Sequence, residues 1–538
     1  MWQSIVAVVT ALLLLLCFPP FDLHFLAWIS FAPLLFVIAE GLREGRAFWL
    51  GWLVGIEFTF FAENWIAHSM TVFGGMFTGV AYAVAMLFAA VLALFPALFA
   101  LVISRLVNLW GVRAIALAPI AWAATEWIRP FVTGITWNAV GVSQYRNQFV
   151  VRLAQYGGVY LISAFVLAAN ALLVMGLMAV KRKDWAVLKP AVLLLLCTVA
   201  AAAFVHSQRR VDSDVRQAVT VVGVQPNLPP DKTTTTLDLE NNIKLTKQAL
   251  DRLPDKKADL VIWAESPLSL FYESDDYVRG RLDNLANETR SHLIVNIVAQ
   301  HNERYFNSIQ TISPQTGSQF HKRYDKIRLV PFGEYVPLNS VLKYVVPRVI
   351  STDSGGFAAG KEAVVNVLKL ETESGIVISS DQEASSLQRT TNFVRVGSFI
   401  CYEAAYPDLV RQFVKNGATL LVNVSNDAWF GTTAGARQHL AHAVMRAVEN
   451  DRDLIRVTNS GISALVTAEG QVHDPMPMFA SDSRAWQARP RRGITFYTRH
   501  GDWFAVGCAI ATLCALTVGF TKKSKNLKNL RNVPEVRR

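Results

Sequence analysis

Hydrophobic residues divide the chain into an almost wholly apolar N-terminal part, a mixed central part and a short apolar run near the C-terminus. Before residue 206 we count about seven apolar segments, each close to the ~20 residues that a helix needs to cross a bilayer. An eighth segment covers residues 503–520. This pattern predicts a helical membrane domain over 1–205, and a last membrane helix with its tail over 501–538. The seven segments are expected at 4–20, 25–41, 47–68, 77–104, 113–128, 158–180 and 187–205.

The central part, residues 206–500, has the pattern of a folded α/β domain. Two stretches, 237–253 and 435–452, have apolar residues at helical spacing. Strands interleaved with helices are typical of an α/β sandwich, and the short links between some strands indicate antiparallel hairpins. Alternating or continuously β-branched runs predict strands at 218–225, 258–265, 292–299, 306–313, 394–403, 419–427 and 454–466.

The composition and the charges of the loops support a membrane protein with one large exported domain. The chain is 52% hydrophobic and only 17% charged, which is too apolar for an ordinary soluble enzyme. Basic residues stay on the cytoplasmic side of a membrane protein. If both termini are cytoplasmic, the basic residues of three loops and of the C-terminal tail lie on that side, although the loop at 129–157 breaks the pattern. Part of the net charge of +11 is therefore explained by basic residues on the cytoplasmic side, and the charge does not indicate nucleic-acid binding.

Among the five cysteines, Cys401 has a distinctive setting. The other four lie in apolar segments, where a thiol is usually a small apolar filler. In an exported domain thiols usually form disulfides, but the predicted central domain contains no second cysteine. Cys401 is therefore either a buried filler or a reactive group.

Three other polar residues favour the reactive interpretation. Glu265 ends a predicted strand in "VIWAESP", and "YDKIRLVPFGEYVP" supplies Lys326 and Glu334. A thiol nucleophile needs a base to take its proton, and a cation can stabilise the oxyanion that forms when the thiol attacks a carbonyl. Open α/β sheets place such groups at strand ends.

These two motifs, together with "ICYEAAYPD" and "VSNDAWFG" (424–431), resemble the motifs that carry the Glu–Lys–Cys triad of the nitrilase (carbon–nitrogen hydrolase) superfamily. With the flanking apolar segments, the whole chain resembles the apolipoprotein N-acyltransferase family, the membrane-anchored members of that superfamily. The resemblance implies a multi-pass α-helical membrane domain of about eight transmembrane helices and an exported αββα sandwich over 206–500. It implies no metal and no soluble cofactor.

The resemblance also implies a role for each residue that matches the motifs. Cys401 would be the nucleophile, Glu265 the general base and Lys326 the group that holds the oxyanion. Glu334, Tyr402 and Glu403 would support the triad, with the two acids orienting Lys326 and the substrate amine.

The implied reaction has two halves. The nucleophile takes an acyl chain from a phospholipid and forms a thioester, and the amine of the diacylglyceryl-cysteine of an apolipoprotein then accepts the chain. The implied location is the bacterial inner membrane, with the catalytic domain on the periplasmic side. The expected partners are membrane lipids and the apolipoprotein, with no nucleic acid, and we expect a monomer.

There are two alternatives to acyl transfer. A membrane-anchored amidase of the nitrilase type would hydrolyse a small amide with the same triad, but one anchor helix would suffice for it. A non-catalytic transporter or scaffold could use the embedded acids Glu63 and Glu126. A metal site at His439 and His442 would need further ligands that the sequence does not indicate; we interpret both histidines as packing or helix-surface residues.

Overall fold

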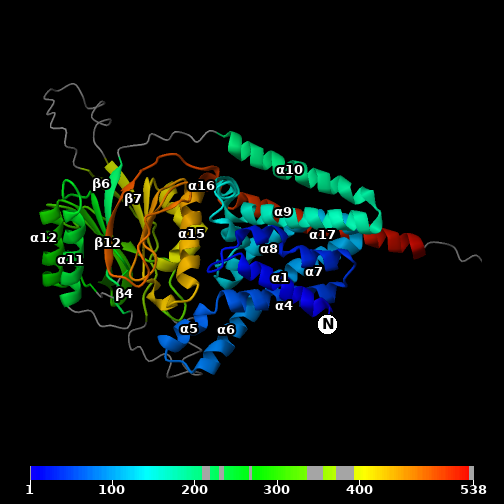
Figure 1. Cartoon of the computed structure of the whole chain (residues 1–538), viewed down its shortest axis with the longest axis horizontal. Helices are drawn as coiled ribbons and strands as arrows, with labels where there is room; N and C mark the ends of the chain where they lie inside the picture. Colours follow the sequence, from blue (N-terminus) through cyan, green and yellow to red (C-terminus); the bar gives the residue numbers. More distant parts are fainter. Residues whose placement is uncertain are drawn as a thin grey trace, which may run out of the picture. The chain divides into compact units, whose positions relative to one another are not determined.

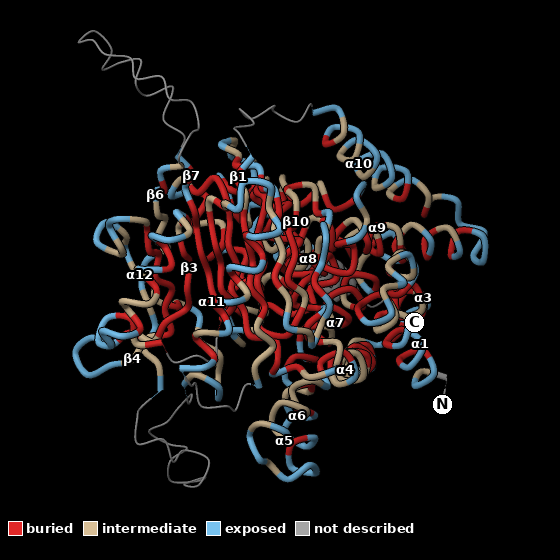
Figure 2. Tube along the Cα trace, turned by 60° about the vertical axis from the view of Figure 1, so that its left-hand side comes forward, coloured by how far each residue is buried: buried red, intermediate tan, exposed pale blue. Residues whose placement is uncertain are grey.

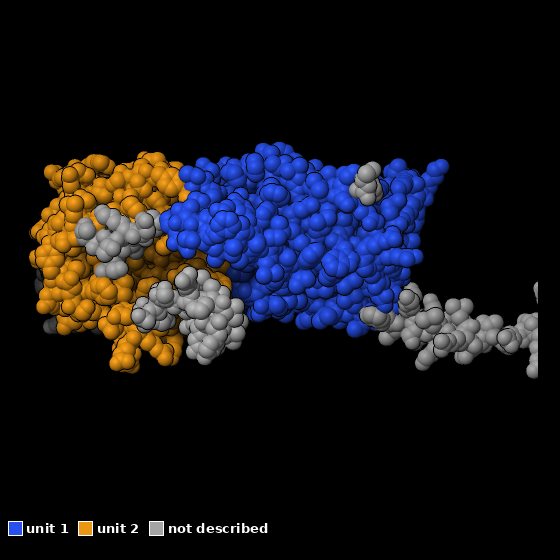
Figure 3. Space-filling view, turned by 90° about the horizontal axis from the view of Figure 1, so that it is seen from below, with its two compact units in different colours: residues 1–209, 432–441, 500–538 blue, residues 210–431, 442–499 orange. Residues whose placement is uncertain are grey.

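The structure is a computed structural model that describes residues 2–208, 218–229, 236–265, 270–335, 356–370 and 393–531. The chain forms two compact units, coloured separately in Figure 3. Unit 1 comprises residues 1–209, 432–441 and 500–538, and unit 2 comprises 210–431 and 442–499.

Unit 1 is built from apolar helices (Figure 1). Three helical stretches among the described residues are long and apolar enough to cross a membrane, namely Thr78–Trp110, Val151–Arg182 and Trp185–Ser207. Shorter apolar helices cover Gln3–Leu16, His24–Ala39 and Trp503–Gly519. The multi-helical apolar domain is thus confirmed, and the count of eight membrane spans stays a prediction. The helices are α1 (Trp2–Leu16), α2 (Ala27–Ser30), α3 (Ala32–Ala39), α4 (Glu44–Ala62), α5 (Trp65–Val72), α6 (Thr78–Leu92), α7 (Leu94–Trp110), α8 (Ala118–Thr133), α9 (Ala154–Arg182), α10 (Leu188–Ser207) and α17 (Trp503–Arg531).

Two expected segments, 47–68 and 25–41, are not single helices. The first is divided between α4 and α5, and the second is a 3-10 turn, His24–Leu26, followed by α2 and α3. At the break, the side-chain oxygen of Asn170 on α9 accepts hydrogen bonds from the backbone N–H groups of Phe31 (2.8 Å) and Ala32 (3.0 Å). The Asn170 amide nitrogen donates to the carbonyl of Ala27 at 2.9 Å. A fully buried amide therefore satisfies backbone groups that a continuous helix would pair internally.

Small residues allow α4 and α7 to pack closely. A Cβ on Gly51 would lie 2.6 Å from the Pro96 carbonyl oxygen and 2.7 Å from the Ala100 Cβ. A Cβ on Gly55 would lie 2.7 Å from the Ala93 Cα. Close approach through small side chains is a common way for apolar helices to associate where water supplies no driving force.

In the ranges that the structure describes, unit 2 contains two six-stranded sheets, in the orders β12-β1-β2-β3-β4-β5 and β11-β10-β9-β8-β7-β6. The sheets pack face to face, with β1 and β2 against β9 and β4 against β7. The first sheet comprises β1 (Val219–Gln225), β2 (Leu260–Trp263), β3 (His292–His301), β4 (Arg304–Ile312), β5 (Tyr324–Asp325) and β12 (Asp482–Ala488). The second comprises β6 (Val365–Lys369), β7 (Phe393–Ile400), β8 (Leu420–Ser425), β9 (Leu454–Thr458), β10 (Ala464–Val466) and β11 (Val472–His473).

Helices cover the outer faces and complete the predicted αββα layering (Figure 1). On the first sheet lie α11 (Thr236–Asp251) and α12 (Asp276–Thr289), whose apolar residues join a buried cluster with β1, β2 and β3. On the second sheet lie α14 (Pro407–Lys415) and α15 (Gly435–Asn450). The first part of α15, residues 435–441, belongs to unit 1. The central strands are almost continuously buried (Figure 2), which explains their unbroken apolar runs.

Candidate active site

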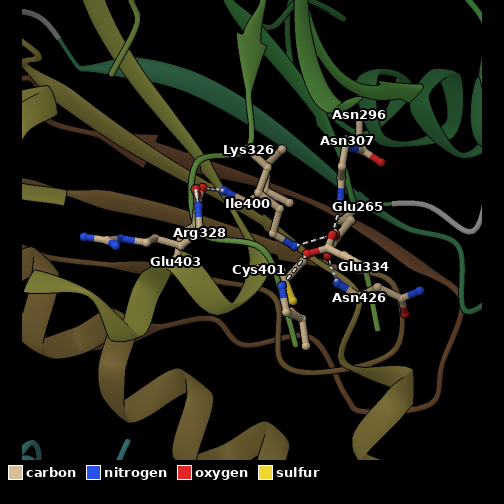
Figure 4. Close-up of polar contacts among 12 residues, drawn as sticks. Glu265, Asn296, Asn307, Lys326, Arg328, Glu334, Ile400, Cys401, Glu403 and Asn426 are labelled. Atoms are coloured by element: carbon tan, nitrogen blue, oxygen red, sulfur yellow. Dashed lines mark hydrogen bonds and ion pairs between the residues drawn. The ribbon is translucent and has the colours of Figure 1, made fainter. Parts of the chain in front are cut away.

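The candidate site lies where β2, β5, β7 and β8 end or lead into their following loops (Figure 4). Cys401 follows β7 directly and begins a 3-10 turn that extends to Ala405. Its backbone has φ 51°, which is uncommon for a residue with a side chain. Such strained backbone is often found at functional positions, and here it turns the chain sharply after the strand.

Glu265, Lys326 and Glu334 form one buried polar cluster. The Lys326 ammonium donates to Glu334 Oε1 at 2.8 Å and lies 3.4 Å from Glu265 Oε1. Lys326 is 1% exposed. Burial opposes the charge on the ammonium, but the two carboxylates overcome this effect and hold the pKa of Lys326 above its ordinary value.

Asn307 on β4 links the two carboxylates. Its amide nitrogen donates to Glu265 Oε1 at 2.9 Å and to Glu334 Oε1 at 2.7 Å. Asn296 on β3 fixes the orientation of this amide by donating to its oxygen at 2.7 Å. The other oxygen of Glu265 accepts from the backbone N–H of Asn426 at 2.9 Å. Both oxygens of Glu265 are therefore fixed in direction.

The surroundings of Cys401 favour the neutral thiol over the thiolate. Burial raises the pKa of the Cys401 thiol above its ordinary range, and the charge of Glu265 acts in the same direction. The Lys326 ammonium opposes both. A thiol with these neighbours loses its proton only as part of a reaction in which a base accepts it.

Glu403 holds the backbone on both sides of the site. Its carboxylate accepts from the N–H groups of Ile327 (2.7 Å), Arg328 (3.0 Å) and Ile400 (2.8 Å), and from the hydroxyl of Tyr324. Figure 4 shows the carboxylate beside Arg328 and Ile400. Glu403 thus ties the loop that follows Lys326 to the end of β7. Its hydrogen bonds are with backbone N–H groups and the Tyr324 hydroxyl, and Lys326 acts on it through charge.

Of the six residues that the sequence singled out, the structure brings Glu265, Lys326 and Glu334 into direct contact. Electrostatic interaction links Cys401 to the first two of these. Tyr402 is partly exposed and packs edge-on against Tyr406, with ring centroids 5.3 Å apart. His439 and His442 are both buried on α15.

Sequence reasoning assigned no role to Asn307, Tyr324 or Asn426. Asn307 is a polar residue inside the predicted strand 306–313, and Asn426 lies in the quoted word "VSNDAWFG". Asn426 could have been found because it lies in a quoted motif, and Tyr324 because it opens "YDKIRLVPFGEYVP". Asn307 lies among several other polar residues in its strand and carries no comparable signal.

The comparison with known families covers both units. The family "Apolipoprotein N-acyltransferase N-terminal domain" matches residues 10–172, and the family "Carbon-nitrogen hydrolase" matches residues 218–480. Among solved structures, Saccharomyces cerevisiae Nit3, a member of branch 10 of the nitrilase superfamily, aligns with 51% of this chain and 92% of its own, with a TM-score of 0.37 and 16% identity.

Curated relatives match the chain along nearly its whole length. The apolipoprotein N-acyltransferase of Geobacter metallireducens is 30% identical over 532 residues, which cover 97% of this chain and 96% of the relative. That of Haemophilus influenzae is 32% identical over 513 residues, covering 93% and 91%. Because the similarity extends through the helical unit and the sandwich alike, the chain belongs to the apolipoprotein N-acyltransferase family.

Proposed function

We propose that the protein transfers an acyl chain from a phospholipid to the N-terminal amine of a diacylglyceryl-cysteine apolipoprotein, with Cys401 as the nucleophile. The observation that carries the proposal is the grouping of a buried thiol with one lysine and two carboxylates, on a chain similar to named N-acyltransferases. Glu265, Lys326 and Cys401 form the catalytic triad.

In the first half-reaction, Glu265 takes the proton of the Cys401 thiol while the sulfur attacks the ester carbonyl of the phospholipid. The Lys326 ammonium stabilises the negative oxygen of the tetrahedral intermediate. The intermediate collapses to a thioester, and the departing lysophospholipid oxygen receives the proton from Glu265. Glu334 keeps the ammonium in place through its 2.8 Å ion pair.

In the second half-reaction, the amine of the apolipoprotein attacks the thioester carbonyl. Glu265 now takes a proton from the amine and returns it to the Cys401 sulfur as the C–S bond breaks. The product is an amide, and the enzyme regains its thiol. The triad thus serves both halves without a net change in its protonation.

We further propose that residues 206–500 form the catalytic domain on the periplasmic side of the bacterial inner membrane, with both termini cytoplasmic. The supporting observation is the charge of the loops and the basic tail. The domain boundaries at 205 and 501 and a monomeric state complete the proposal. Lipid substrates favour such an anchored enzyme because extracting an acyl chain costs ~0.8 kcal/mol per CH₂.

The test is intact-mass spectrometry of the purified full-length protein after incubation with phospholipid alone. We expect a gain of one acyl chain, removable by hydroxylamine and absent in Cys401→Ser. Cys508→Ser, which removes another buried thiol, serves as the matched control and should be acylated like the wild type. A lipopeptide with a free amine should then discharge the chain as an amide.

Two results would count against the proposal. Acylation of Cys401→Ser at the wild-type level would exclude Cys401 as the nucleophile. Discharge of the thioester by water as fast as by the lipopeptide would favour a hydrolase of the amidase type.

A further inference from the structure

A buried serine lies beside the nucleophile on the neighbouring strand. Strands β7 and β8 run parallel, and Ile400 pairs with Val424. The next residues, Cys401 and Ser425, are therefore level with each other at the ends of strands that lie ~4.8 Å apart. Ser425 is 0% exposed, and its side chain hydrogen-bonds with the Cys401 thiol.

The same hydroxyl also contacts a fixed carboxylate. Ser425 Oγ donates to Asp427 Oδ1 at 2.8 Å. Asp427 is 1% exposed, and Arg456 on β9 donates to both of its oxygens at 3.0 and 2.7 Å. Gly461 approaches so closely that a Cβ there would overlap the Asp427 carboxylate. Asp427 is therefore held in place as an ionised acceptor.

Arg456 reaches the nucleophile by a second route. It also donates to the side-chain oxygen of Asn423, whose amide nitrogen lies 3.5 Å from the carbonyl oxygen of Cys401. The buried guanidinium thus supports both the backbone of Cys401 and, through Asp427 and Ser425, its sulfur. Sequence reasoning gave no role to any of these four polar residues.

A hydroxyl has one proton to donate and two lone pairs that accept. While Cys401 is a thiol, Ser425 gives its proton to Asp427, and its oxygen can accept from the S–H group. When the thiol proton passes to Glu265, the sulfur changes from donor to negatively charged acceptor. A hydrogen bond donated by the hydroxyl to the sulfur then becomes more favourable, because hydrogen bonds to charged groups are stronger than those to neutral groups.

We propose that Ser425 is a positioning residue for acyl transfer, whose hydroxyl proton turns from Asp427 to the Cys401 sulfur whenever the sulfur carries negative charge. The proton stays on the serine oxygen throughout, and no covalent bond forms or breaks at Ser425. This inference rests on the proposed function, since it requires Cys401 to be the nucleophile.

The electrostatic balance around the thiol agrees with this role. Burial is the main cause of the raised pKa of Cys401, and the charges of Glu265 and Asp427 add to it. The Lys326 ammonium and the hydrogen bond from Ser425 both act in the opposite direction and lower the pKa of the thiol. Loss of the hydroxyl should therefore make the thiolate harder to form.

The test is the rate of alkylation of Cys401 by iodoacetamide from neutral to alkaline pH, in the full-length protein. The rate is followed on the peptide that contains Cys401, so that the other four cysteines do not contribute. We expect Ser425→Ala to move the midpoint of the pH profile upward and to slow alkylation about tenfold at a fixed pH below it. Ser463→Ala, which removes a buried hydroxyl bonded to Gln225 instead, should leave the profile unchanged.

A second pair of variants keeps the test decisive if Ser425→Ala does not fold. Ser425→Thr and Ser425→Val have similar shapes and differ mainly in the hydroxyl. We expect the threonine variant to react within about threefold of wild type, and the valine variant about tenfold more slowly. The rate of thioester formation should follow the same order, without a change in the phospholipid concentration that gives half the maximal rate.

Each possible result supports or overturns the inference. Overlapping pH profiles for wild type and Ser425→Ala, or for the Thr and Val variants, would overturn it. If Cys401→Ser is inactive in that case, the proposed function stands and only the role of Ser425 fails. If Cys401→Ser keeps its acyltransferase activity, the proposed function itself fails.

Discussion

The most informative single substitution outside the triad is Glu403→Gln, because it keeps the size of the side chain and removes only its charge and one acceptor. Glu403 is 0% exposed and accepts from three backbone N–H groups and from the Tyr324 hydroxyl. A glutamine can keep its oxygen toward Ile327 and Arg328. Its NH₂ group then faces the N–H of Ile400, which loses its acceptor.

The expected cost follows from these contacts. An unsatisfied buried N–H costs about 1–3 kcal/mol, and each remaining bond weakens by about 1 kcal/mol when its acceptor loses its charge. With three bonds remaining, we therefore expect a loss of about 4–6 kcal/mol in the stability of unit 2. The loop after Lys326 is also released from the nucleophile strand. Because a misplacement of ~1 Å can cost ~100-fold in rate, thioester formation should slow by at least that factor.

Asp453→Asn is the matched control. Asp453 is also buried and accepts from two backbone N–H groups, those of Ala468 and Arg489, but it lies at the opposite end of the strands from Cys401. The melting temperature should fall in both variants. Thioester formation, followed by intact-mass spectrometry, should slow only in Glu403→Gln. Wild-type rates in a destabilised Glu403→Gln would refute the idea that this carboxylate sets the geometry of the site.

Three further predictions concern other parts of the molecule. Asn307→Asp should abolish thioester formation in a folded protein, because it sets a third carboxylate against the two that this amide bonds; activity at a tenth of wild type or more would contradict this. Burial lowers the pKa of His321 to about 4. The contribution of neutral His321 to stability is therefore present above pH 6.5 and is lost as the pH falls toward 4. In His321→Gln the melting temperature should depend less on pH across this window. Gly51→Ala should destabilise unit 1 by about 1–3 kcal/mol through overpacking, whereas Gly45→Ala on the same helix, where a Cβ meets nothing within 4 Å, should be neutral or slightly stabilising in a thermal melt.

The strands that the sequence predicted and those it missed differ in their place in the sheets. The predicted runs became β1, β2, β3, β4, β7, β8, β9 and β10, all interior to the two sheets. The described strands without a predicted run are β5, β6, β11 and β12, which are the four edges. A central strand is covered on both faces and needs a continuous apolar run. An edge strand has fewer neighbours, so its sequence carries a weaker signal.

The sequence by itself determined the parts of this protein that depend on local pattern. These are the apolar helices, the buried strands and the motifs that contain Glu265, Lys326 and Cys401. Tertiary structure alone decided where isolated polar residues find their partners. Asn170 accepts hydrogen bonds from the backbone N–H groups at the helix break near Phe31. Ser425 hydrogen-bonds with the Cys401 thiol and with a buried carboxylate. Hydrophobic periodicity arises from neighbours along one element, whereas a buried polar group must be satisfied by whichever distant segment the fold brings to it. For that reason the partners of Asn170, Tyr324 and Ser425 could not be read from the chain in advance, whereas Glu334 and Glu403 were named from their motifs.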